Sequence, residues 1–324
     1  MKDSTGVTID LVRENLMGQT ANFFGRAPAA GLMSLALAAA LSACGGAGGP
    51  GSAGTATPAA GTPAKTSAST PTPTATTSTS VKQSSLPVYW IGESRRSFAL
   101  YREFREVPDT GGPISSAVSA MTRLKPLDPD YKNPWRPAAR VTASQTGDAI
   151  TVDLSPDTFA NTQIGGEVAD RAVQQLVYTA TAAAQQTGAP AGSVKITVDG
   201  KAFDAWGVVQ LGESMKRAPM ATVQAHTWVT SPQEGGVLPA GTVTFKGYGT
   251  SFEANFVWQV RKDSGGVVAK GFTMGGGGDG TFGEFTFTAK LPAGTYSVEV
   301  SGGDASGGAE GPGAAVDDKT FSVR

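Results

Sequence analysis

Residues 166–187 of this 324-residue chain read GEVADRAVQQLVYTATAAAQQT, the most regular stretch of the sequence. Glu167 near its start suits the positive end of a helix dipole, and Gly188 and Pro190 follow its end. Apolar residues recur at the three- and four-residue steps of one helix face, at Val168, Ala172, Val173, Leu176, Val177, Ala180 and Ala184. The stretch therefore predicts a long amphipathic helix that buries one face.

Shorter patterns surround this helix. Apolar and polar residues alternate on both sides of Gly92-Glu93-Ser94, which predicts two strands joined by a turn there. Residues 113–123 begin with a proline and predict a short helix. Further strands are expected at 140–144, 149–154 and 194–198. Helices interspersed with strands predict an α+β domain in which the helices cover one sheet.

From residue 225 onward the helical period disappears and short strands recur between Gly, Pro and Asp residues. Trp258 stands where immunoglobulin folds carry a core Trp, and Tyr296 where they carry a corner Tyr. The expected strands are 227–229, 242–248, 254–260, 267–272, 283–288, 295–300 and 319–323. The pattern predicts a β-sandwich, so the whole chain is expected to be multidomain, α+β followed by all-β.

The composition excludes several classes of protein. With 43 Gly and 20 Pro, an all-helical fold is disfavoured. A formal net charge of −1 offers no electrostatic footprint for a phosphate backbone, so no nucleic-acid partner is expected. One His and one Cys leave little for metal sites or His-dependent catalysis, and we expect no metal, no cofactor and no enzymatic activity.

An apolar run at 27–43 ends in Leu41-Ser42-Ala43-Cys44. At about 17 residues it is short for a membrane-spanning helix and suits a secretory signal peptide. The ending resembles a bacterial lipobox, which implies cleavage before Cys44 and a lipid such as palmitate on its sulfur. That resemblance implies a signal peptide over 1–43, with translation starting at Met1 or Met17, and anchorage to the extracytoplasmic face of the cell membrane.

Every residue from 45 to 80 except Lys65 is Gly, Ala, Pro, Ser or Thr. Such a segment has almost no apolar surface to offset the entropy of ordering it, so a disordered tether is expected over 44–84. Two domains follow, over 85–218 and 222–324.

Val88-Tyr89-Trp90, ITVDLS at 150–155, RAVQQLVYT at 171–179 and Val198-Asp199-Gly200 occur in this order. The combination resembles the GerMN domain of bacterial spore-germination and related lipoproteins. The resemblance implies a small α+β module for interaction or assembly outside the cytoplasm, with no catalytic residues to assign.

Ser231-Pro232, FEANFVW at 252–258, GGVV at 265–268 and LPAGTY at 291–296 mark the second domain. These segments resemble the immunoglobulin-like domain of bacterial spore-germination proteins. The Gly-rich stretch at 301–313 departs from that pattern, so no binding site is assigned to this loop.

Candidate partner contacts lie in the first domain. Tyr131 and Trp135 belong to DYKNPWRP, a loop whose prolines keep it out of a sheet interior. Aromatic side chains on a stiff loop suit protein or sugar contacts, and the alternative is that Trp135 folds back over the core. Arg95 and Arg96 begin a basic cluster in which acidic residues, Glu103 among them, are interleaved. That mixture favours a solvated, salt-bridged strand face over a partner site.

Other polar residues carry weaker signals. Asp128 and Asp130 lack the regular acidic spacing of a calcium loop, and a solvated loop is favoured. A search for a catalytic carboxylate pair finds no motif around any of the candidates, which are Asp128, Asp130, Asp148, Asp153 and Asp157. Asp153 is interpreted as a cap of a turn or helix. His226, the only imidazole, has no evident nucleophile and is interpreted as structural.

Together these features predict a non-catalytic, membrane-anchored extracytoplasmic lipoprotein that acts as a binding or assembly module at the cell envelope. Its expected partners are the membrane, through the lipid on Cys44, and an envelope protein or the cell wall. One alternative is an accessory lipoprotein that modulates a membrane sensor, and another, of a different class, is a cell-wall hydrolase.

Overall fold

The computed structural model describes residues 83–303 and 313–324, except residue 96, all within one compact unit of the chain. The predicted signal peptide, Cys44 and the predicted tether up to residue 82 lie outside the described residues. The first strand already begins at Gln83, two residues before the expected start of the first domain at residue 85. None of the helices in the described part of the chain is both long and apolar enough to cross a membrane.

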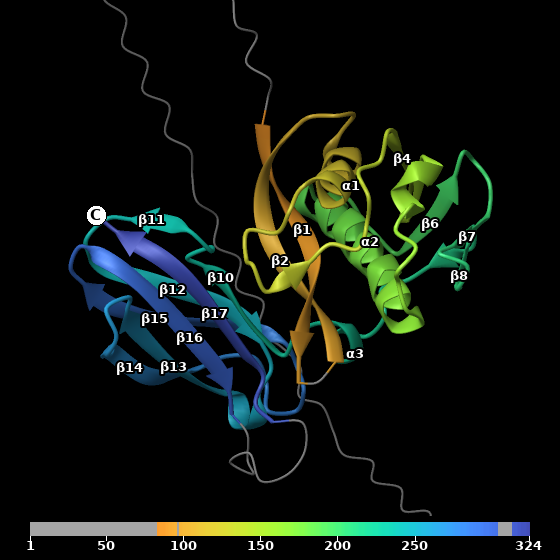
Figure 1. Ribbon diagram of the computed structural model, residues 1–324. Coiled ribbons are helices and arrows are strands. Elements are labelled where there is room, and N and C mark those ends of the chain that lie inside the picture. The colour runs from red at the N-terminus through yellow and green to blue at the C-terminus, as the bar shows by residue number, and fades with distance from the viewer. Residues whose placement is uncertain (1–82, 96, 304–312) are drawn as a thin grey trace, which may run out of the picture. The chain divides into compact units, whose positions relative to one another are not determined.

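The first domain opens with a long hairpin (Figure 1). Strands β1 (Gln83–Ser94) and β2 (Ser97–Pro108) pair antiparallel along their whole length, from Gln83 opposite Pro108 to Ser94 opposite Ser97. The expected turn at Gly92 is therefore wrong, because Gly92 lies inside β1. A Cβ atom there would come within 2.8 Å of the Tyr101 ring, so this glycine allows close packing of aromatic rings.

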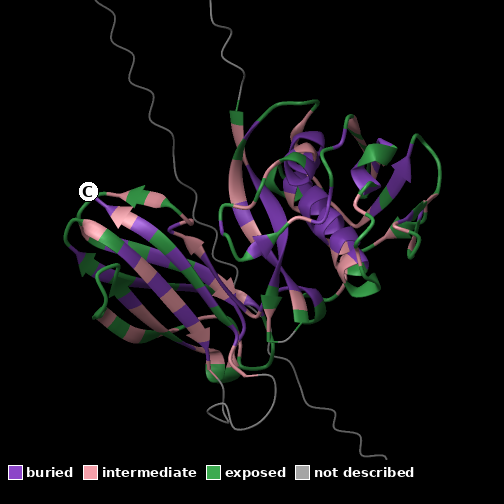
Figure 2. Cartoon of the chain, in the orientation of Figure 1, coloured by how far each residue is buried: buried purple, intermediate pink, exposed green. Residues whose placement is uncertain are grey.

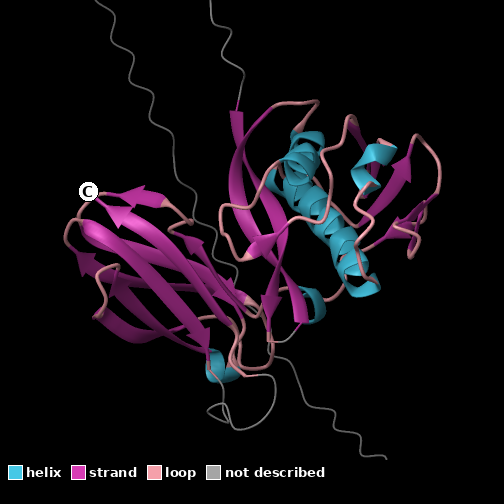
Figure 3. Ribbon diagram, viewed as in Figure 1, coloured by secondary structure: helices cyan, strands magenta, loops and turns pink. Residues whose placement is uncertain are grey.

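Both predicted helices are confirmed. Helix α1 (Pro113–Arg123) and helix α2 (Gly166–Gln186) pack against each other and against β1. The buried face of α2 includes Ala172, Val173, Leu176 and Val177, as the periodicity predicts. Figure 3 shows both helices among the strands of this domain.

The expectation of one sheet is wrong, because the first domain holds two larger sheets and a small ribbon. One sheet has the order β2-β1-β3, and the other has the order β4-β5-β6-β9. In the second sheet β5 and β6 are parallel, and α2 lies in the connection between them. The strands are β3 (Tyr131–Lys132), β4 (Val141–Thr146), β5 (Ala149–Leu154), β6 (Ser193–Val198) and β9 (Ser214–Met215), and the ribbon is β7 (Phe203–Ala205) with β8 (Val209–Leu211).

The second domain is a sandwich of two sheets, with strand orders β10-β12-β15 and β11-β17-β16-β13-β14. All seven expected strands are present. An eighth, β11, was not expected and runs parallel to β17. The strands are β10 (Thr227–Ser231), β11 (Gly236–Leu238), β12 (Gly241–Gly249), β13 (Asn255–Lys262), β14 (Val267–Met274), β15 (Gly283–Leu291), β16 (Gly294–Gly302) and β17 (Val316–Val323).

Packing in this sandwich follows the alternation of each strand. Buried and more exposed residues alternate along β15 and β16 (Figure 2). Trp258 stacks on Phe287 with ring centroids 4.4 Å apart. The Tyr296 hydroxyl donates a hydrogen bond to the carbonyl of Pro292 at 2.9 Å, which is the geometry of a tyrosine corner.

The apolar core of the first domain continues past α3 (Met220–Val223) into the second domain. Ala225, Trp228 and Phe282 belong to the same buried cluster as the residues that pack around α2. Ala225 also donates its backbone N–H to Leu100 on β2 at 3.1 Å. The two domains therefore share buried apolar contacts, whereas a freely jointed pair would not.

Candidate binding sites

The two aromatic residues predicted to contact a partner are buried, which corrects that prediction. Trp135 is 3% exposed, donates its indole N–H to Gln175 on α2 at 3.1 Å and packs against Phe159. Tyr131 is 6% exposed and stacks on Tyr101. Trp135 thus folds back over the core, because α2 supplies the acceptor that a buried indole requires.

Arg95 is exposed and makes local contacts. Its Nε donates to the carbonyl of Gly313 at 2.9 Å, and its Nη1 lies 2.7 Å from Nδ1 of His226. The other ring nitrogen of His226 faces the carbonyl of Ala221 at 3.2 Å. A ring that donates from Nε2 and accepts at Nδ1 satisfies both contacts, which fits the structural interpretation of His226. Arg96 lies outside the described residues, and partner binding by either arginine stays a prediction.

Glu103 departs from the solvated strand face predicted for β2. It is 5% exposed and accepts hydrogen bonds from the indole N–H of Trp90 at 2.8 Å and from the backbone N–H groups of Leu127 and Asp128 at 2.9 and 3.1 Å. Arg105 pairs with the same carboxylate at 3.1 Å. One buried carboxylate therefore holds the loop after α1 against β2.

Asp153, one of the carboxylates considered for catalysis, is also held by structural partners. Asp153 pairs with Arg140 and accepts hydrogen bonds from Thr197 Oγ1 and the Gly200 backbone, both at 2.7 Å. Desolvation opposes the charge of Asp153, but these hydrogen bonds outweigh it and lower the pKa of the carboxyl. Within the described residues no group of three or more His, Cys, Asp or Glu side chains is placed to hold a metal ion.

A buried charged cluster links the two domains and consists of Asp128, Tyr131, Asp317 and Lys319. The Lys319 ammonium donates to Asp128 at 2.6 Å and to Asp317 and the Tyr131 hydroxyl at 2.8 Å each. That hydroxyl in turn donates to Asp317 at 2.8 Å. Burial alone would lower the pKa of Lys319, but Asp317 and Asp128 raise it and keep the ammonium charged. Asp128 is thus a buried counter-ion, which corrects the prediction of a solvated loop there.

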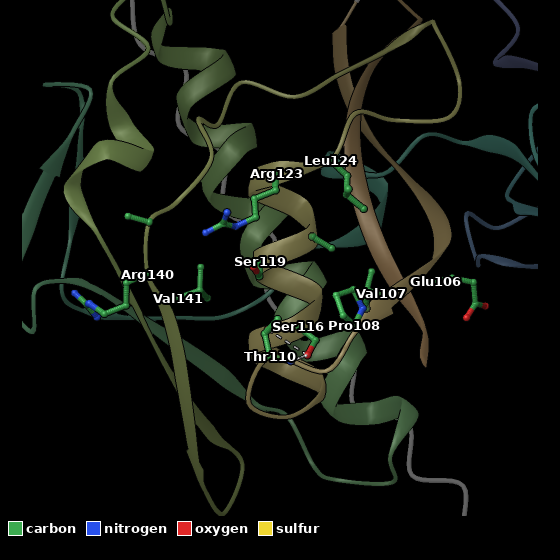
Figure 4. A pocket seen from close by; sticks show the side chains of 12 residues that line it. Glu106, Val107, Pro108, Thr110, Ser116, Ser119, Arg123, Leu124, Arg140 and Val141 are labelled. Atoms are coloured by element: carbon green, nitrogen blue, oxygen red, sulfur yellow. Dashed lines mark hydrogen bonds between the residues drawn. The ribbon is translucent and has the colours of Figure 1, made fainter. Parts of the chain in front are cut away.

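A pocket with a volume of about 500 Å³ lies between β2, α1 and β4 (Figure 4). Residues at three- and four-residue steps of α1 form its base, so one stripe of the helix faces the opening. The end of β2 forms one wall, and the start of β4 forms the other. The lining residues are Glu106, Val107, Pro108, Thr110, Ser116, Ser119, Ala120, Arg123, Leu124, Ala139, Arg140 and Val141.

A second candidate is an apolar surface on β13 and β14, called here the β14 surface: Val257, Val268, Phe272 and Met274. Phe272 is 72% exposed and lies directly opposite Val257 in the strand register. Val268, Phe272 and Met274 alternate along β14 and therefore share one face of the sheet. Strand β14 ends the sheet order, with β13 as its one neighbour in that sheet. Its C-terminal end lies beside β15, where Thr273 Oγ1 donates to the carbonyl of Thr286 at 2.7 Å, so the open part of the edge is the earlier part of β14. Large exposed apolar side chains on an edge strand make this surface a candidate site of interaction.

The burial of the charged residues on β17 and β2 could have been predicted from the strand period in the sequence. Asp317 and Lys319 stand at two-residue steps from the buried residues Phe321 and Val323 along β17, so all four lie on one face of the strand. Glu103 shares a face of β2 with the buried Tyr101 and Val107 in the same way. The strand period therefore already placed these charges on an inward face.

Comparison with known proteins identifies both domains. Residues 87–204 match the family described as "Sporulation and spore germination", and residues 226–309 match the "Immunoglobulin-like domain of bacterial spore germination". The chain contains both spore-germination domains. The sporulation and spore-germination domain carries the pocket, and the immunoglobulin-like spore-germination domain carries the β14 surface. The predicted family resemblance and fold class are thereby confirmed.

Solved structures add only distant likenesses. CopC from Methylosinus trichosporium OB3b is 20% identical over 30% of this chain and 93% of its own, with a TM-score of 0.23. A chain from "Structural basis of T cell specificity and activation by the bacterial superantigen toxic shock syndrome toxin-1" is 11% identical over 30% of this chain and 98% of its own, with a TM-score of 0.20. Among curated proteins, none matches this sequence. The assignment of the domains therefore depends on the two family matches.

Proposed function

We propose that this chain is a non-catalytic lipoprotein, anchored through Cys44 outside the cytoplasmic membrane, that binds an extended segment of another envelope protein. The observation that carries the binding role is the β14 surface. An edge strand can accept a further strand by backbone hydrogen bonds, and its alternating side chains supply specificity. Three exposed apolar side chains on one face of β14 fit a partner strand whose alternate residues are also apolar. Lys270, between Val268 and Phe272 on that face, favours an acidic residue opposite it.

The ion pairs of Asp128 and Asp153 support the proposal that the chain is not catalytic. A glycosidase-type reaction needs two carboxyl groups free to act on the substrate, one as acid and one as base or nucleophile. Asp128 and Asp153 are instead bound to Lys319 and Arg140. Purified cell wall incubated with the chain is therefore expected to release no muropeptides, and release that an Asp153→Asn change abolishes would establish the hydrolase alternative.

The anchor is tested in cells with the full chain. We expect Cys44→Ser to move the protein from the membrane fraction to the soluble fraction, because the thioether to lipid can no longer form. Fractionation followed by immunoblotting measures the shift. The control Ser52→Ala, in the same Gly- and Ala-rich region, should leave the protein with the membrane. Retention of the Cys44→Ser protein in the membrane fraction would contradict the lipid anchor.

The partner surface is tested by photo-crosslinking in cells. A photoreactive amino acid at Phe272 is expected to trap one envelope protein, whereas the same group at Val237 should trap none. Val237 is the matched control, because it is 56% exposed and lies on β11, at the opposite end of the same sheet. We expect Phe272→Ala to weaken co-purification of the trapped protein roughly 10-fold or more, as removal of an aromatic anchor does. Equal trapping from both positions would refute the β14 surface as the binding site.

A further inference from the structure

The pocket in the sporulation and spore-germination domain is built from two sheet edges and one helix stripe. Strand β2 ends the order β2-β1-β3, and β4 ends the order β4-β5-β6-β9. Ser116, Ser119 and Arg123 follow one another at steps of three and four along α1, between those edges. Helix and strands thus leave an opening of about 500 Å³, within the range of roughly 300–1,000 Å³ found for small-molecule sites.

The polar side of this pocket has one cation that forms no salt bridge. Arg123 donates through Nη2 to the carbonyl of Ala138, and no ion pair to it is formed within the described part of the chain. Its charge still reaches Asp157, whose pKa is lowered chiefly by a hydrogen bond with Ser155 and to a smaller extent by Arg123. Arg140, across the pocket, is already paired with Asp153 and Asp199. Arg123 therefore keeps guanidinium N–H donors for a ligand, and Figure 4 shows Ser119 on the same helix.

The remaining walls are largely apolar, apart from Thr110 and the exposed Glu106 near the end of β2. Val107 and Pro108 come from β2, Leu124 follows α1, and Val141 begins β4. Apolar walls with a small number of placed polar groups are typical of sites that orient a ligand by its polar end. One unpaired guanidinium matches the single charge of a carboxylate and its two oxygens.

We propose that this pocket binds a carboxylate attached to an apolar body, with the carboxylate on Arg123 and Ser119 and the body against Val107, Leu124 and Val141. The chemistry has two sources: a free fatty acid, or the C-terminus of an apolar peptide. This site is separate from the β14 surface and does not depend on the proposed function.

Binding is measured by calorimetry on residues 74–324, the compact unit that includes every described residue. The probes are decanoate and its uncharged counterpart decanol, and an acetylated apolar tripeptide as the free acid and as the amide. At least one acid is expected to bind about 10-fold or more tightly than its uncharged counterpart, the worth of a charge-assisted hydrogen bond. Tighter binding of decanoate indicates the fatty acid, and tighter binding of the peptide acid indicates a chain terminus.

Variants locate the site. Arg123→Gln should weaken acid binding about 10-fold or more, whereas Arg136→Gln, at an exposed arginine outside the pocket, should leave it unchanged. Ser119→Phe, which fills the opening from a partly exposed helix position, should abolish binding without loss of helical circular dichroism. Equal affinity for acid and uncharged probes, absence of binding at millimolar concentration, or insensitivity to Arg123→Gln would each overturn the proposal. The comparison of probes on the unmodified protein remains decisive even if a variant fails to fold.

Discussion

Replacement of Lys319 by Met is expected to lower the free energy of unfolding by about 3–5 kcal/mol, the cost of leaving buried charges without their counter-ion. Lys319 is 3% exposed, and its ammonium is the donor shared by Asp128 and Asp317. Without it, two carboxylates buried between the domains lose their cation, and the Tyr131 hydroxyl loses one donor. Urea unfolding of residues 74–324, followed by tryptophan fluorescence, measures the loss.

Two further variants separate the buried cluster from a general effect of losing a lysine. Lys290→Met, at an exposed position on β15, should change stability by no more than about 0.5 kcal/mol. Adding Asp128→Asn and Asp317→Asn to Lys319→Met should restore part of the stability, because no uncompensated charge remains buried. A loss below about 1 kcal/mol for Lys319→Met, as for an exposed ion pair, would show that the cluster is not buried in solution.

Glu103→Ala is expected to cost about 3–5 kcal/mol, since one substitution removes the acceptor of several buried donors and the partner of a charge. The indole N–H of Trp90 and the backbone N–H groups of Leu127 and Asp128 would lose their acceptor, and Arg105 would lose its ion pair. Because Asp128 belongs to the buried cluster, the damage should extend to the contact between the domains. Thermal and urea unfolding both measure it.

The same strand provides the control. Glu106→Ala, three residues along β2 and exposed, should leave stability within about 0.5 kcal/mol of the unmodified protein. Glu103→Gln keeps the shape and one acceptor oxygen, so its cost should lie between those of the two alanine variants. Equal effects of Glu103→Ala and Glu106→Ala would mean that Glu103 is solvated, as the interleaved charges of this strand predict.

The periodicity of apolar residues correctly predicts the elements that bury one face. It predicted α1, α2 and seven strands of the sandwich, because a stripe or an alternation of apolar residues states which face is covered. It failed at Gly92 and Trp135. The sequence pattern predicts a turn at Gly92, but this residue lies in a strand beneath two aromatic rings. Trp135 lies in a proline-bearing loop, and nothing near it in the sequence announces the acceptor that Gln175 supplies from 40 residues away.

The candidate sites also combine features that the sequence shows with features that only the tertiary structure shows. The alternating apolar residues of β14 are visible in the sequence, but their exposure depends on the order of strands in the sheet, which places β14 at an end. The pocket forms because the edge strands β2 and β4 lie on either side of α1, and no local sequence pattern predicts that arrangement. Arg123 gave no signal of its own in the sequence.

The residues alone specify two spore-germination domains, α+β and then all-β, because the spacing of apolar side chains dictates which faces need cover and the motifs are local. Which element packs on each of these faces is decided by the tertiary structure. Only the folded chain brings Asp128 to Lys319, 191 positions apart, and turns charges that looked solvated into a buried contact between domains. The reason is physical: burial and pairing depend on distance in space, which a one-dimensional pattern does not contain.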